Sequence, residues 1–150
     1  MAIERFQLYR GKPNLQDFKE GATQTFNRGD IVKLSSNLVV IATGTGLGNV
    51  ILGVAAADAS GTTSAKIPVY VVTPEQEWRA FPKSTKKPTG FSLGVDYKIK
   101  QASAGAAEVS TSGGADVVVV AHAVKSKLGT TAGDPMLVRF DVASCKMIEG

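Results

Sequence analysis

The stretch from Gly29 to Thr73 constrains the fold most, because it consists of short apolar runs separated by clusters of Gly, Ser, Thr and Asn. The runs are DIVKL, LVVIA, VILGVAAA and AKIPVYVV, and they are rich in Val and Ile. Runs this short are typical of strands, whereas helices need about ten residues or more. Between Leu34 and Ala65 the only charged side chain is Asp58, so this sheet must pack against its own core or a neighbour.

The whole chain has the composition of one all-β domain. Its 150 residues match the size of a single domain, and its 16 glycines, many Ser and Thr residues and lack of a long 3.6-residue period argue against a helical bundle. We therefore predict one small β-barrel of short antiparallel strands in residues 26–150. An extended N-terminal arm is predicted in residues 1–25.

The predicted arm contains the segment IERFQLY, which is able to form a strand with Phe6 and Leu8 on one face and Arg5 and Tyr9 on the other. Two placements remain open for so aromatic a segment. It lies along its own barrel, or it docks on another subunit by strand addition.

Later segments repeat the strand pattern. Residues Val95 to Lys100 alternate between apolar and polar side chains, as in a half-buried strand. Further strands are predicted at Glu108–Thr111, Asp116–Val124 and Pro135–Val142. Pro68 has no backbone donor, so we expect it at a sheet edge or a strand start.

Two short motifs have simple structural interpretations. Arg28, Gly29 and Asp30 match the tripeptide that integrins recognise, but they are also a turn before a strand, in which Asp30 accepts a hydrogen bond from a nearby amide. The loop Gly44 to Asn49 resembles the start of a dinucleotide-binding motif. It lacks the third glycine and the following helix, so we interpret it as a hairpin tip.

No catalytic or metal-binding constellation emerges. His122 is the only histidine and shares a strand face with valines, and Cys145 is the only cysteine. One Cys and one His fall short of an ordinary zinc site, and Glu75 and Glu77 lie on a predicted exposed turn. We expect no enzyme activity and no cofactor. The single thiol requires no oxidising compartment, and without a leader or a span of ~18 apolar residues we expect a soluble protein that does not enter a membrane.

The positive charge of the chain is uneven. The formal net charge is +4, and residues 79 to 100 hold six basic side chains against Asp96 alone. The loop Pro82 to Gly90 contributes three of these lysines. Nucleic acid could use this loop with Trp78 and Phe81, although such binders normally add a stacking platform or a longer basic stripe. A solvated face, or contact with an acidic protein surface, is the simpler interpretation.

The order of these features resembles the capsid decoration (cement) proteins of tailed bacteriophages. The resemblance rests on the pattern of apolar strands and turns over roughly residues 26 to 142, without a catalytic signature. The matching segments are Gly29 to Ser35, Val39 to Gly44, Ile51 to Thr63, Ile67 to Trp78, Leu93 to Ile99 and Gly133 to Phe140.

The resemblance implies a β-barrel or β-tulip domain on the outer surface of the virion, where it holds neighbouring major capsid protein subunits together. It also implies a homo-oligomer, with a trimer preferred and a dimer as the alternative. Capsid contacts are predicted in the arm at Ile3, Arg5, Phe6, Leu8, Tyr9, Arg10 and Phe18. Further capsid or subunit contacts are predicted at Trp78, Arg79, Lys83, Lys86 and Lys87.

Two other functions stay open. The first is that of a small nucleic-acid-binding barrel. The second is that of another structural component of a phage head or tail, such as a tail-tube or head-completion protein. Salt-dependent nucleic-acid binding would favour the first, and rings or tubes formed without capsid would favour the second.

Overall fold

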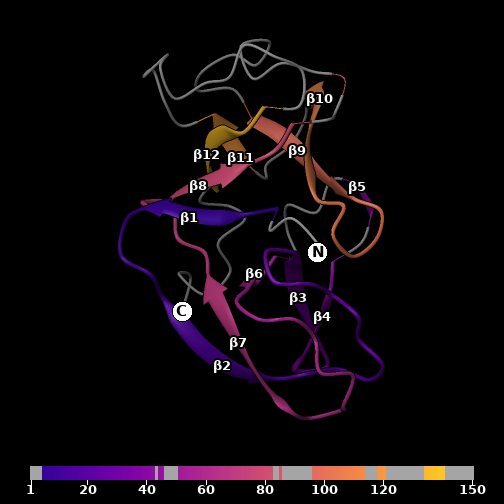
Figure 1. Ribbon diagram of the computed structural model, residues 1–150. Coiled ribbons are helices and arrows are strands. Elements are labelled where there is room, and N and C mark those ends of the chain that lie inside the picture. Colours follow the sequence, from indigo (N-terminus) through magenta and orange to yellow (C-terminus); the bar gives the residue numbers. More distant parts are fainter. Residues whose placement is uncertain are drawn as a thin grey trace.

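The computed structural model describes residues 5–42, 44–45, 51–82, 85, 96–113, 118–120 and 134–140. Every regular element in these ranges is a strand, which confirms the predicted all-β class. The strands form two antiparallel sheets, one above the other in Figure 1. Sheet A has the order β1 (Gln7–Arg10), β8 (Glu77–Ala80), β12 (Met136–Phe140), β11 (Val118–Val120), β9 (Asp96–Gln101) and β10 (Glu108–Gly113), with β5 (Gly44–Thr45) paired to β9. Sheet B has the order β2 (Leu15–Lys19), β7 (Lys66–Val71), β6 (Gly53–Ala55), β3 (Ile31–Ser35) and β4 (Leu38–Ile41).

The four apolar runs of the Gly29 to Thr73 stretch are β3, β4, β6 and β7, which are neighbours in sheet B, as the sequence predicts. The β3–β4 hairpin turns at Ser36 and Asn37, both at positive φ (51° and 64°). Positive φ at both central residues matches the right-handed twist of the flanking strands. A tight hairpin therefore joins the runs DIVKL and LVVIA.

Each sheet curls so that strands at its two sides approach one another. In sheet B, Glu20 at the end of β2 bridges Val39 of β4, and the Gly21 amide donates to the Val39 carbonyl (2.8 Å). In sheet A, the Val109 amide of β10 donates to the Phe81 carbonyl just after β8 (2.8 Å). The domain therefore consists of two curled sheets.

The core has two parts, because sheet B buries side chains on both of its faces. Ile31 of β3 points toward sheet A, where it joins a cluster built around Phe6, Trp78 and Phe140. Val32, the next residue, points to the opposite face, into a second cluster around Phe26. A sheet covered on both faces reads as continuous apolar sequence. This double burial explains why residues 51–55, which are all buried, carry no charged side chain.

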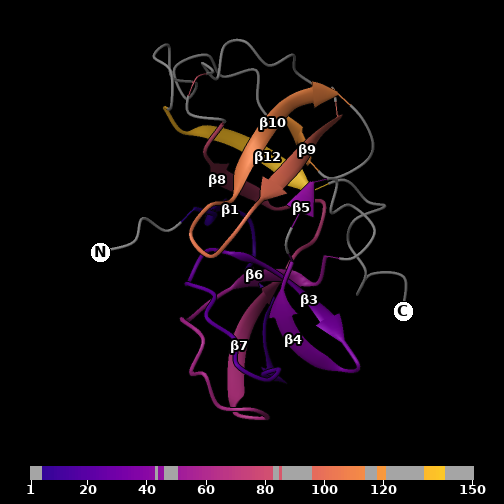
Figure 2. The same cartoon turned by 90° about the vertical axis from the view of Figure 1, so that its right-hand side faces the viewer.

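Gln101 at the end of β9 fastens sheet A to sheet B. Its side chain is fully buried, and its Oε1 accepts a hydrogen bond from the Ile31 amide (2.9 Å). Its Nε2 donates to the Ile31 carbonyl (2.8 Å) and also to the Ala42 carbonyl. This amide side chain therefore bonds to three backbone groups where the sheets meet. Figure 2 shows β9 of sheet A above β3 of sheet B.

The expectation for Pro68 was wrong, because Pro68 lies within β7, between β2 and β6. Its carbonyl accepts from the Ala56 amide (3.0 Å), just beyond the end of β6 at Ala55. In a strand the N and O of one residue point to the same side, so the missing donor faces a place where the β6 ladder has ended. On the β2 side, Pro68 lies opposite Asp17 at a non-hydrogen-bonded position of the ladder, where no backbone N–H is needed. The ladder accommodates proline without a sheet edge.

We expect Gln101→Leu to lower the free energy of unfolding by at least ~2 kcal/mol, because it leaves the Ile31 amide and the Ala42 carbonyl unpaired in the core. Urea denaturation measures the change. Gln16→Leu, at an exposed position of β2, serves as the matched control and should change stability by less than about 0.5 kcal/mol. Equal stability of the two variants would contradict the role given to Gln101.

Candidate interaction surface

The predicted arm lies along its own domain, which settles the choice between its two placements. β1 pairs with β8 in sheet A, and β2 pairs with β7 in sheet B. Residues 7–19 therefore pass down one side of both sheets, as the indigo segment of Figure 1 shows. We call this side, from Gln7 to Lys19, the lateral strip.

Three of the predicted arm contacts point inward. Phe6 is 0% exposed and its ring centroid lies 5.7 Å from that of Phe140, while Leu8 packs against the same cluster. Phe18 is half-buried against the second cluster. Phe6 is therefore a core residue, and its prediction as a surface contact was wrong because a strand of alternating side chains must give one face to the core.

Arg5 connects the start of the chain to sheet A. Its guanidinium lies 4.5 Å from the centroid of the Phe81 ring, and its Nε donates to the Ala107 carbonyl (2.9 Å). Burial lowers the pKa of the guanidinium, against the opposing charges of Glu108 and Asp30. These contacts assign Arg5 a structural part. Ile3 lies outside the described residues.

The exposed part of the lateral strip combines aromatic, basic and apolar side chains. Tyr9 is 39% exposed, and the guanidinium of Arg10 lies 5.8 Å from its ring centroid. Leu15 on β2 is 54% exposed, more than Tyr9 and Leu34, the other exposed large hydrophobic residues of the described chain. The sequence argument missed Leu15, although the alternation of LQDFK, which places Leu15 on the face opposite Phe18, could have indicated it.

The outer face of sheet A continues this surface. Arg79 lies between Gln7 of β1 and Leu137 of β12, and the next row holds Arg139, whose guanidinium pairs with Glu77 (3.3 Å). A shallow pocket opens here, lined by Tyr9, Arg79, Pro135, Met136 and Leu137. We call the outward side of β1, β8 and β12, which carries Gln7, Arg79 and Arg139, the arginine face. Its exposed charges are mainly basic.

Trp78 does not belong to this surface. It is 0% exposed, and its ring meets those of Tyr70 and Phe140 edge-on at centroid distances of 6.0 Å. Its indole N–H has no hydrogen-bond partner among the described residues. The prediction of Trp78 as a contact was therefore wrong, because its strand turns this side chain into the core. Lys83, Lys86, Lys87, His122 and Cys145 lie outside the described residues.

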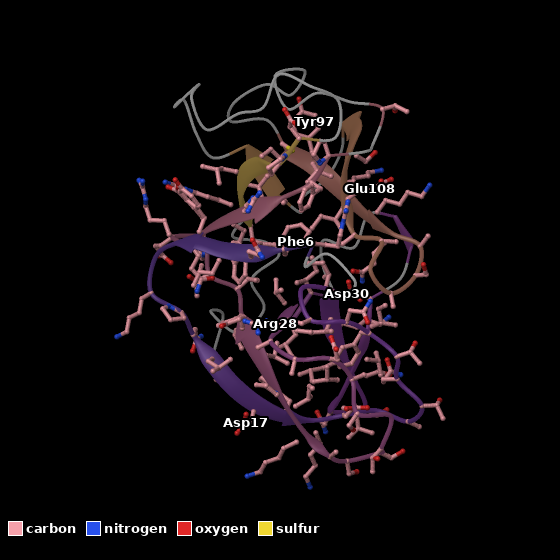
Figure 3. All side chains as sticks on the ribbon, viewed as in Figure 1. Phe6, Asp17, Arg28, Asp30, Tyr97 and Glu108 are labelled. Carbon is pink, nitrogen blue, oxygen red and sulfur yellow. The ribbon has the colours of Figure 1, made fainter. Side chains whose placement is uncertain are left out.

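The Arg28–Gly29–Asp30 segment is a turn before β3, as predicted. Gly29 has φ of 93°, and the buried Asp30 carboxylate accepts from the Asn27 amide (2.8 Å). It also accepts from the Gly105 amide (2.9 Å), which ties sheet B to the β9–β10 loop. Figure 3 shows Asp30 where the two sheets meet. An aspartate held in this way is not available to a receptor.

Within the described ranges, no group of three or more His, Cys, Asp and Glu side chains is placed to hold a metal ion. No helix in the same part of the chain is long and apolar enough to cross a membrane. A scan against protein-family models found no matching family, and searches of curated proteins and of solved structures found no significant match.

We expect deletion of residues 2–21 to abolish cooperative unfolding. The deletion removes Phe6 from the core, two sheet strands, and the Glu20 carboxylate that accepts from the Ser60 and Gly61 amides (both 2.8 Å). Circular dichroism during thermal melting measures the loss. Deletion of residues 2–4 alone, which leaves every described strand in place, should retain a cooperative transition. A folded 22–150 fragment would show that the lateral strip is a dispensable arm.

Burial raises the pKa of the Asp30 carboxyl, and this effect outweighs the hydrogen bonds from Asn27 and Gly105 and the charge of Arg5. We expect carbon-detected NMR titration to give a pKa above the ordinary ~3.9. Between the unfolded pKa and the higher folded pKa, the folded state binds more protons. The Asp30 contribution to the free energy of unfolding therefore falls as pH rises through this window. A measured pKa at or below the ordinary value would contradict this account.

Proposed function

We propose that this chain is a structural virion protein that binds the outer surface of an assembled phage capsid. In this role it bridges neighbouring major capsid protein subunits and stabilises the shell. The observation that carries the proposal is the lateral strip, where Tyr9, Arg10 and Leu15 stand exposed on strands held by both sheets. The sequence resemblance to decoration proteins supports the same function.

The lateral strip suits protein binding because it is ordered before the partner arrives. Its strands are fixed by β8 and β7, so docking does not incur the cost of ordering a loose segment. Tyrosine and arginine are also the residue types that contribute most at protein interfaces. A protein that binds only the assembled shell stabilises it by mass action.

Oligomerisation would strengthen this effect, and we propose a trimer, with a dimer as the alternative. Joined subunits bind one shell at several points, so their combined affinity exceeds that of each contact. The proposal includes no catalytic step and no cofactor.

A nucleic-acid-binding function is less well supported than the sequence suggested. Its proposed stacking residue, Trp78, is buried in the core and cannot stack on a base. The arginine face supplies positive charge, but one of its arginines, Arg139, is already paired with Glu77. Capsid binding therefore remains the proposal.

Mixing the purified protein with undecorated, expanded capsids and sedimenting the mixture tests this function. We expect the wild-type protein to pellet with the capsids, and the double variant Tyr9→Ala, Leu15→Asp to bind at least ten-fold more weakly, because it removes both exposed apolar contacts from the lateral strip. Leu34→Asp is the matched control, since Leu34 is as exposed as Tyr9 (39%) but lies on the β3–β4 hairpin.

Each variant should first be shown to melt near the wild-type temperature. Wild-type protein that stays in the supernatant would refute capsid binding. Strong, salt-dependent binding to an oligonucleotide in the same assay would favour the nucleic-acid function instead. A loss of binding in Leu34→Asp that equals the loss in the double variant would move the contact away from the lateral strip.

A further inference from the structure

The outer edge of β2 has no strand partner in the described chain from Leu15 to Phe18. β2 pairs with β7 along one edge, and its other edge first meets β4 at Glu20. The side chains of Leu15, Gln16, Asp17 and Lys19 are all exposed. Figure 3 shows Asp17 on this strand at the outside of sheet B.

The hydrogen bonds of neighbouring residues show which backbone groups face outward. The Asn14 carbonyl accepts from the Val71 amide, and the Glu20 amide donates to the Ala65 carbonyl (both 2.9 Å). Even-numbered residues of β2 therefore point their backbone groups toward β7, and odd-numbered residues point theirs outward. The position of Pro68 is consistent with this alternation. Pro68 has no N–H, and it lies opposite Asp17, whose backbone groups point away from β7 and form no hydrogen bond with it.

The outward row is already used as a strand edge at its far end. The Gly21 amide, the next odd-numbered residue after Lys19, donates to the Val39 carbonyl of β4 (2.8 Å). The backbone groups of Leu15 and Asp17 continue this row without a partner strand in the described chain. A strand added here would extend sheet B on the side where the lateral strip runs.

A second copy of this chain fits the edge poorly. The antiparallel register that pairs all five residues of β2 with those of another β2 places Asp17 directly opposite its own counterpart, and like charges in that position are destabilising. A shift of two residues in one direction brings Asp17 opposite Lys19, but it runs the pairing into Glu20 and Gly21, which are already bound. A shift in the other direction places Lys19 opposite Pro13, which has no N–H to donate. Charges of this kind protect natural sheet edges against self-pairing.

We infer that the open edge of β2 at Leu15 and Asp17 binds an extended segment of the capsid protein, which adds as a strand with a basic side chain opposite Asp17. The inference rests on the proposed function and names the contact that performs it. Main-chain hydrogen bonds to Leu15 and Asp17 provide affinity, and the charge of Asp17 with the apolar side chain of Leu15 selects the partner sequence.

The test compares Asp17→Pro with Asp17→Asn in capsid sedimentation. Proline removes the outward N–H of residue 17 but no hydrogen bond of the β7 ladder, and prolines are tolerated where the N–H faces solvent. We expect both variants to melt near the wild-type temperature. Asp17→Pro should bind capsids at least ten-fold more weakly than Asp17→Asn, which keeps the N–H and loses only the charge.

Hydrogen exchange of backbone amides gives a second readout. In the free protein the Gln16 and Phe18 amides should exchange slowly and the Leu15 and Asp17 amides rapidly, and capsid binding should protect the latter two. Equal binding of the proline and asparagine variants, or no protection of Leu15 and Asp17, would overturn strand addition while leaving capsid binding intact. Failure of the wild-type protein to bind would overturn both. Self-association of the wild type that Asp17→Pro abolishes would show that a second copy occupies the edge, and would overturn the capsid assignment.

Discussion

The fold depends on the hydrogen bonds by which Gln101 joins the two sheets. The Ile31 carbonyl also accepts from the Ala42 amide (3.1 Å), but the Ile31 amide and the Ala42 carbonyl are held by the Gln101 side chain. A buried amide can bond to both of these groups, which an apolar side chain cannot do. The same residue fixes how β9 crosses β3. The aromatic cluster then fills the space that this crossing defines.

A second polar connection lies beside the first. Asp30 precedes Ile31 in the chain, and its carboxylate holds Gly105 in the loop between β9 and β10, where φ is 74°. Asp30 thus binds the β9–β10 loop of sheet A, and the adjacent Ile31 binds Gln101 at the end of β9. Buried polar groups of this kind are costly unless fully satisfied, so they favour one arrangement of the sheets over others. This rigidity allows the lateral strip to present its exposed residues in fixed positions on both sheets.

Strand positions could be predicted from sequence because they follow from local pattern. The short Val- and Ile-rich runs and the Asp30 turn are each specified by a few neighbouring residues. Placements that depend on distant partners could not be predicted. Trp78 and Phe6 were expected at the surface, because nothing adjacent to them shows that β12 and β3 bring Phe140 and Ile31 against them. Gln101 ends an alternating strand, and its partners lie 59 and 70 residues away.

Pro68 shows how such distant partners also shape the candidate site. From sequence, a proline within an apolar run indicates an edge, yet here it lies inside a sheet because β6 ends beside it. Its presence fixes the parity of β2, since the residue opposite must turn its own donor outward. The N–H and C=O groups of Asp17 therefore point away from β7, at the centre of the exposed strand β2. Pro68 in β7 thereby determines which backbone atoms of β2 remain open to a partner.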